Sequence, residues 1–130
     1  KFVRTGEFNP NSEFRFSNDG SESRFNYNMD IRRNNANYQT TPMSNSWVYN
    51  SVIFNTKILS NKRIKKIKTP ILMFSAENDR VVKNCAQKKL ADKLFCCKRV
   101  IVNCSKHSIL TANAEAIESH LKEVLAYLEA

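Results

Sequence analysis

Two residues in the second half of the chain, Asp79 and His107, have the types and positions that acid–base chemistry needs. Each follows a short apolar run that predicts a strand, residues 71–75 before Asp79 and residues 99–102 before His107. The carboxyl ends of parallel strands lie at one edge of a sheet, so we expect the two side chains to meet there. A carboxylate that accepts the Nδ1 proton of a histidine leaves Nε2 free to take a proton from a hydroxyl. In this chain order the pair forms two members of a hydrolytic triad.

The elements that must position this pair are predicted from the apolar pattern around it. Residues 71–74 form a continuous apolar run, which is typical of a buried parallel strand. A helix is predicted over residues 81–94, because its apolar residues recur on one face. A strand, a helix and a second strand in this order favour a right-handed parallel unit. A last helix, capped by Asn113, is predicted to run to the C-terminal end of the sequence.

The first third of the chain has a different texture. Residues 1–45 are rich in Asn, Ser and Arg, with aromatic residues interspersed. We predict loops, short turns and one helix over residues 21–33, capped by Ser21 or Ser23. A further helix is predicted over residues 45–59, capped by Ser44 or Ser46. The polar first part is too poor in periodic apolar residues to form a core alone, so we expect it to lie over another surface.

Length and composition fit a single small globular domain. The chain has 130 residues, of which 42% are hydrophobic and 25% are charged. The sequence contains no apolar run of the roughly 20 residues that cross a bilayer. A cytoplasmic protein is therefore expected, with peripheral membrane contact as an addition.

The four cysteines, Cys85, Cys96, Cys97 and Cys104, show no spacing typical of a disulfide framework. Free thiols in a reducing cytoplasm are the favoured interpretation. A zinc site built from these thiols and His107 is the alternative, but only Cys104 and His107 have the spacing of paired zinc ligands. We therefore predict neither a metal nor a cofactor.

The formal net charge of +9 favours anionic partners. The densest basic run comprises Lys62, Arg63, Lys65, Lys66 and Lys68. Ile64 and Ile67 interrupt it three residues apart, which predicts a short helical face packed on a body. A solvated helix surface is the simplest interpretation. Contact with lipid head groups is the second, and nucleic acid the third, which we do not expect.

Two segments resemble a known family. The segment from Lys68 to Asn84, KTPILMFSAENDRVVKN, resembles the acid segment of the α/β-hydrolases, and more narrowly of their lysophospholipase and monoacylglycerol lipase branch. The segment from Lys106 to Leu110, KHSIL, followed by a helix, resembles the histidine segment of that branch. Residues 21–25 and 42–47 resemble the end of the family's cap and its link back to the core.

The resemblance implies an α/β fold: the C-terminal portion of an α/β-hydrolase, with parallel strands and flanking helices, preceded by part of a cap region. Residues 1–45 would belong to the cap or lid, and residues 46–130 to the hydrolase core. The implied activity is that of a serine carboxylic ester hydrolase acting on lysophospholipids or monoacylglycerols. Asp79 and His107 would be the acid and the histidine of its Ser-Asp-His triad.

The family's serine, which lies in a Gly-x-Ser-x-Gly turn, has no counterpart here. The chain has only Gly6 and Gly20, so it contains no such turn. Ser75, Ser105 and Ser108 lack flanking glycines, and we reject each of them as the nucleophile. We therefore expect this chain to be the C-terminal part of a longer hydrolase whose N-terminal half is its partner. Alone, it is predicted to be inactive and not to be a well-folded monomer.

Two other interpretations of function remain open. A non-catalytic basic interaction module fits the net charge and the missing serine, but leaves the placement of Asp79 and His107 unexplained. Another α/β-hydrolase reaction, such as cleavage of a peptide, a thioester or a haloalkane, fits the acid and histidine equally well. The substrate in such folds is chosen largely by the cap and the nucleophile region.

Overall fold

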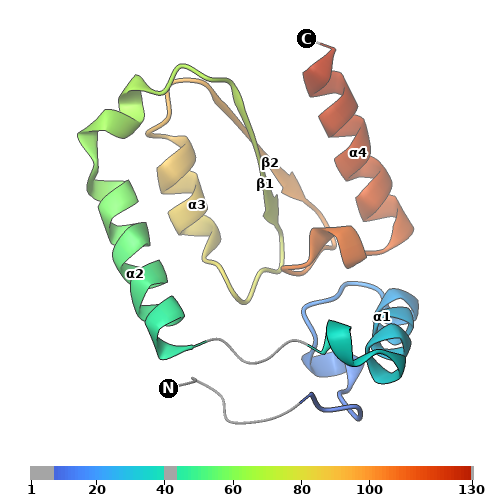
Figure 1. Ribbon diagram of the computed structural model, residues 1–130. Helices are drawn as coiled ribbons and strands as arrows, with labels where there is room; N and C mark the ends of the chain where they lie inside the picture. The colour runs from blue at the N-terminus through green and yellow to red at the C-terminus, as the bar shows by residue number, and fades with distance from the viewer. Residues whose placement is uncertain (1–7, 40–43, 130) are drawn as a thin grey trace.

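The computed structural model describes residues 8–39 and 44–129 (Figure 1). The part of the first predicted region that lies in residues 1–7 and 40–43 is outside the described residues. The elements, in chain order, are η1 (Phe14–Phe16), α1 (Glu22–Asn34), η2 (Ala36–Tyr38), α2 (Asn45–Ser60), η3 (Lys62–Lys66), β1 (Ile71–Ala76), α3 (Asn84–Ala91), β2 (Cys97–Val102), η4 (Ile109–Thr111) and α4 (Ala114–Leu128). The described chain is thus mixed α/β.

A parallel pair of strands lies at the centre of the described structure. β1 pairs with β2 from Ile71 opposite Cys97 to Ala76 opposite Val102. The parallel pairing predicted from the sequence is confirmed. β2 begins two residues before its predicted start, because the amide of Ile71 donates to the carbonyl of Cys96 at 2.9 Å and extends the ladder.

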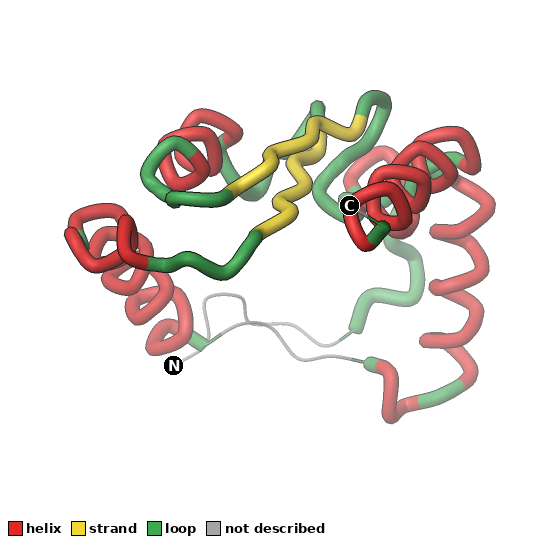
Figure 2. The backbone as a smooth tube through the Cα atoms, turned by 90° about the horizontal axis from the view of Figure 1, so that it is seen from above, coloured by secondary structure: helices red, strands yellow, loops and turns green. Residues whose placement is uncertain are grey.

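Helices cover both faces of this small sheet, as Figures 1 and 2 show. Side chains alternate between the two faces of a strand. On one face, Phe74 and Val102 pack with Ala112 and Ala116, at and before the start of α4. On the other face, Ser75 of β1 bonds to Gln87 of α3. The main apolar cluster therefore lies between the sheet and α4.

The predicted helix over residues 81–94 is shorter in the structure. α3 begins at Asn84, because the Asp79 carboxylate binds the amides of Val81 and Val82 and holds them in a turn. After Ala91, residues 92–93 form a turn and residues 94–96 a bend, so the α-helix does not continue to residue 94. The prediction was wrong because an apolar periodicity does not reveal a side chain that competes for backbone amides.

The predicted N-caps at Ser44 and Asn113 are confirmed, whereas Ser21 precedes α1 without a side-chain capping bond. Ser44 Oγ accepts from the amide of Trp47 at 3.1 Å, and Asn113 Oδ1 accepts from the amide of Ala116 at 2.9 Å. The first four cations of the basic run lie in the 3₁₀ helix η3, in which Ile64 is buried, and Lys68 follows it. α2, in contrast, has no buried side chain although it is rich in apolar residues.

The first described segment lies against the loop that carries His107. Asp19 forms a parallel bridge with Ser108, and the amides of Gly20 and Ser21 both donate to the carbonyl of Thr111. Gly20 permits this approach, since a Cβ there would lie 2.9 Å from the Cα of Ala112. α1 follows directly and contributes Phe25 and Met29 to the buried residues. The first third therefore lies over another surface, as expected.

Candidate active site

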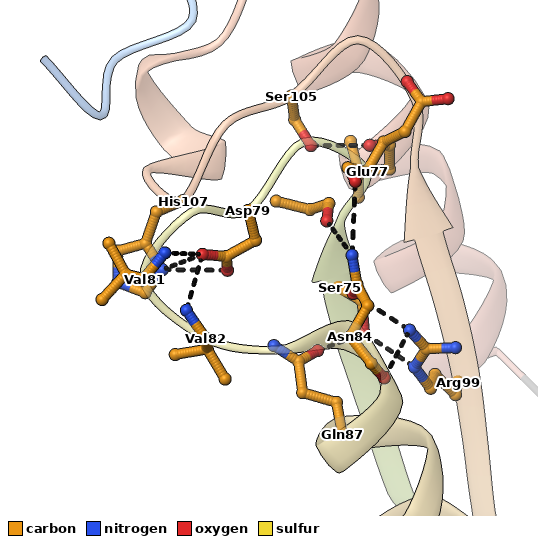
Figure 3. A network of polar contacts seen from close by, with 12 residues as sticks. Ser75, Glu77, Asp79, Val81, Val82, Asn84, Gln87, Arg99, Ser105 and His107 are labelled. Carbon is orange, nitrogen blue, oxygen red and sulfur yellow. Dashed lines mark hydrogen bonds and ion pairs between the residues drawn. The ribbon is translucent and has the colours of Figure 1, made fainter. Parts of the chain in front are cut away.

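The acid loop after β1 is organised by the side chain of Asp79 (Figure 3). Its Oδ1 accepts hydrogen bonds from the amides of Val81 at 2.8 Å and Val82 at 2.9 Å. A carboxylate that receives two backbone amides is fixed in orientation, and the loop is fixed with it. Oδ2 is left to face a different element.

That element is the loop after β2, which brings His107 to Asp79. The Nδ1 atom of His107 lies 2.9 Å from Asp79 Oδ2 and 3.2 Å from Oδ1. The Asp79 side chain is 3% exposed, whereas that of His107 is 40% exposed. Among the described residues, none forms a hydrogen bond with His107 Nε2. The imidazole is therefore anchored at one nitrogen and open at the other.

The protonation state of this pair follows from the surroundings of the carboxylate. Burial of Asp79 acts to raise its pKa, but the amide of Val82, the ring of His107 and the amide of Val81 together outweigh burial and hold the pKa below its ordinary value of 3.8. At neutral pH the carboxylate is ionised and only accepts hydrogen bonds. Nδ1 must then carry the proton, which leaves the Nε2 lone pair of a neutral ring free.

The two loops are tied together by backbone contacts that the sequence did not reveal. The amide of Glu77 donates to the Val102 carbonyl at 3.1 Å, and the amide of Asn78 donates to the Ser105 carbonyl at 2.9 Å. The Glu77 carboxylate also accepts from the amide of Cys104 at 2.8 Å. Cys104 adopts a positive φ of 54°, which is unusual for a residue other than glycine. No sequence signal marks this turn, because a cysteine does not predict a left-handed conformation.

A second polar network supports the acid loop from the α3 side of the sheet. Ser75 Oγ donates to Gln87 and accepts from Arg99 Nε at 2.8 Å. Arg99 also donates to Asn84 Oδ1 at 3.1 Å, and Asn84 Nδ2 donates to the carbonyl of Ala76 at 2.8 Å. These contacts join the start of α3 to the end of β1. The turn that carries Asp79 lies between these two joined points.

The serines rejected from the sequence are placed away from a nucleophilic role. Ser75 and Ser105 are fully buried, and Ser105 Oγ donates to the carbonyl of Val102 at 2.6 Å. Ser108 takes part in the bridge to Asp19 through its backbone. In the described part of the chain, no serine hydroxyl bonds to His107.

An open hollow of about 440 Å³ adjoins the acid loop. Its lining combines a carboxylate with two cationic side chains and comprises Gly20, Asn78, Asp79, Arg80, Cys104 and Lys106. The Lys106 ammonium lies 4.5 Å from the ring centre of Phe14 and is thereby held near the first described segment. The hollow is therefore bounded by both the acid loop and the segment that precedes α1.

The zinc alternative finds no cluster in the structure. Cys85, Cys96, Cys97 and Cys104 are free thiols, and across residues 8–39 and 44–129 no group of three or more His, Cys, Asp or Glu side chains is placed to hold a metal ion. The helices in these two ranges also include none with the length and apolar character needed to cross a bilayer.

Comparisons with models of protein families, with curated proteins and with solved structures found no match to this chain. Any functional assignment must therefore rest on the chemistry of Asp79 and His107, on the loops that hold them, and on the residues of the two segments quoted above.

Proposed function

We propose that this chain supplies the acid and the histidine of a serine carboxylic ester hydrolase, as the C-terminal part of an α/β-hydrolase fold. The observation that supports it best is the 2.9 Å contact between His107 Nδ1 and Asp79 Oδ2. The two residues stand beyond the carboxyl ends of adjacent parallel strands, where open α/β sheets place their sites. A solvated aspartate on a surface loop would not combine a nearly buried carboxylate with two amide donors and an oriented imidazole.

In the proposed reaction, each atom of the pair has a defined role. Asp79 holds His107 in the Nδ1–H tautomer and stabilises the imidazolium that forms. His107 Nε2 takes the proton of a serine hydroxyl as that oxygen attacks the ester carbonyl, and it later gives the proton to the leaving alcohol. Water then attacks the acyl-serine ester while His107 Nε2 takes its proton, and His107 gives this proton to the serine oxygen as the carboxylic acid is released. No cofactor is needed for these steps.

The serine and the oxyanion hole would come from a segment outside this chain. Two features support a larger fold around the described residues. The sheet has two strands in the described ranges, and each has an edge without a neighbouring strand there. The chain also exposes 10087 Å², whereas a folded monomer of this size exposes about 7,000 Å². We therefore propose that the chain alone is inactive.

The proposed substrates are lysophospholipids or monoacylglycerols, and the proposed compartment is the cytoplasm. The support for this substrate class is the resemblance of residues 68–84 and 106–110 to the lysophospholipase and monoacylglycerol lipase branch. Another α/β-hydrolase substrate is the nearest alternative, because an acid and a histidine serve several acyl and alkyl transfers.

The test uses the gene product that contains this chain together with its N-terminal half. Release of fatty acid from a lysophosphatidylcholine and from a monoacylglycerol is measured for the parent and for His107→Ala. We expect His107→Ala to lose at least about a thousandfold in kcat. His120→Gln is the matched control, since His120 is the other histidine of the chain and packs on Phe74, 4.1 Å between ring centres. Full activity in His107→Ala would reject the assignment.

A non-catalytic basic module is the second candidate, favoured by the net charge of +9. It predicts no ester hydrolysis by the longer protein and strong, salt-dependent binding to nucleic acid. The same preparation distinguishes the two, because fatty acid release and nucleic acid binding are measured independently.

A further inference from the structure

The charges of the chain are unevenly distributed around α2 and η3. Between Ile31 and Ala76 the sequence contains eight Lys and Arg residues and no Asp or Glu. Five of the eight fall within seven residues: Lys62, Arg63, Lys65, Lys66 and Lys68, here called the basic turn. Neighbouring charges along such a run are separated by about one Debye length, roughly 8 Å at physiological salt, so their fields add.

The basic turn is anchored by one buried side chain and one capping hydrogen bond, and its cations face solvent. Ile64 is buried and fixes the middle of η3, while Asn61 Oδ1 accepts from the amide of Arg63 at 2.8 Å. All five cationic residues are exposed. Within the described ranges none of them forms an ion pair, although ion pairs occur elsewhere on this surface, as between Lys88 and Asp92. Their charge is therefore available to an external partner.

An apolar stripe on α2 leads to the basic turn. The stripe comprises Trp47, Phe54 and Ile58. Phe54 and Ile58 follow Trp47 by 7 and 11 residues, so the three residues lie within about 40° of one another around the helix axis. Their exposed fractions are 58%, 65% and 39%. Residue 61 alone separates the end of α2 from the start of η3. Exposed aromatic and aliphatic side chains next to a dense set of cations are typical of a surface that binds at a membrane interface.

We propose that the basic turn and this stripe of α2 form a docking surface for an anionic phospholipid bilayer. The cations would contact the head groups, while Trp47 and Phe54 enter the boundary with the acyl chains. A bilayer is favoured over nucleic acid, because a five-residue 3₁₀ helix offers no element that fills a groove and the neighbouring stripe is apolar. The inference does not depend on the ester hydrolase proposal, since binding requires neither Asp79 nor His107.

The test is cosedimentation of the gene product that contains this chain with vesicles of phosphatidylcholine alone and of phosphatidylcholine with about one third phosphatidylserine, a strongly anionic composition. Trp47 is the single tryptophan of this chain, and any tryptophan outside it is replaced by phenylalanine, so that the emission reports on the stripe. We expect binding to the anionic vesicles only, weakened by salt, together with a blue shift of the Trp47 emission. Equal binding to neutral vesicles, or no binding, would overturn the proposal.

Two pairs of variants locate the surface. Replacing all five cations of the basic turn by Gln should lower the partition coefficient more than a hundredfold, since each contributes roughly fivefold near an anionic surface. The matched control removes the same charge from other exposed positions: Arg15, Arg24, Lys88, Lys89 and Lys122. Equal losses in both variants would mean that binding depends on the net charge and not on the position of the cations, which would overturn the assignment.

For the stripe, Phe54→Ser is compared with Tyr49→Ser, because the two residues are 65% and 66% exposed and, being five residues apart, lie about 140° from each other around the helix axis. Only Phe54→Ser should weaken binding and reduce the Trp47 shift. Equal effects of the two would overturn the role of the stripe. Tighter binding of the parent chain to an RNA oligonucleotide than to anionic vesicles at the same salt would replace the bilayer by nucleic acid.

Discussion

Asp79→Asn is the substitution that tests the geometry of the site most directly. Oδ1 of Asp79 accepts the amides of Val81 and Val82, and an asparagine has one oxygen to offer them. The amide oxygen must therefore take the place of Oδ1, which puts the NH₂ group at the place of Oδ2, 2.9 Å from His107 Nδ1. Two donors cannot share that contact, so His107 must move its proton to Nε2.

The consequence for catalysis is large, while that for stability is small. In the proposed reaction, a His107 that carries its proton on Nε2 could not act as a base toward the serine hydroxyl. The same exchange of tautomer in Ser-His-Asp enzymes lowers kcat about 10⁴-fold, which corresponds to about 5 kcal/mol of activation free energy. Folding should lose only about 1–2 kcal/mol, because the two amide bonds persist to a neutral oxygen.

The tautomer is measured on the gene product that contains this chain, without any activity assay. The ¹⁵N shifts of the two ring nitrogens, recorded at about pH 9 where histidine is neutral, identify the protonated one. We expect Nδ1–H in the parent and Nε2–H in Asp79→Asn. Asp92→Asn is the matched control, since Asp92 pairs with Lys88 at 2.7 Å on the exposed side of α3. A parent His107 protonated at Nε2, or an unchanged tautomer in Asp79→Asn, would refute the reasoning.

Three further perturbations, one of pH and two by substitution, should change the free energy of unfolding, which is measured by urea unfolding of the same protein. Because the pKa of Asp79 is lowered in the folded state, the unfolded chain binds more protons near and below pH 3.8; stability should fall as the pH drops below that value, and less steeply in Asp79→Asn. Gly20→Ala should cost about 1–3 kcal/mol through its contact with Ala112, whereas Asn18→Ala on the exposed side should cost little. Cys104→Gly should raise the free energy of unfolding by up to about 1 kcal/mol through relief of the positive φ, while Cys104→Ala, which keeps a Cβ there, should not.

The sequence predicted the elements whose signals are local. The apolar run at residues 71–74 and the cap at Asn113 each depend on a few neighbouring side chains, and both features are present in the structure. The apposition of Asp79 and His107 was also predictable, because it needs only that the two strands be parallel neighbours. Their catalytic role stays a prediction.

Features that depend on pairing between distant segments were not predictable. The register places Met73 opposite Arg99 and Ser75 opposite Ile101. Ser75 and Arg99 are therefore diagonal neighbours on one face of the sheet, where they form a hydrogen bond. Nothing in either strand's own pattern specifies that register. The bond from Cys104 to Glu77 is similar, since it needs a left-handed turn that cysteine does not favour.

The Asp79–His107 pair is held in place although the described chain buries few apolar residues, and the backbone contacts explain why. The two loops meet because the parallel ladder continues past the strands, through the bonds of Glu77 to Val102 and of Asn78 to Ser105. This continuation needs neither a complete sheet nor a large core, and the buried apolar residues of the described chain are few. In the proposed longer hydrolase, this chain and the remaining sheet would therefore make different contributions to the site. This chain would preorganise the histidine. The remaining sheet would supply the serine hydroxyl and the buried apolar surface that stabilises the folded state.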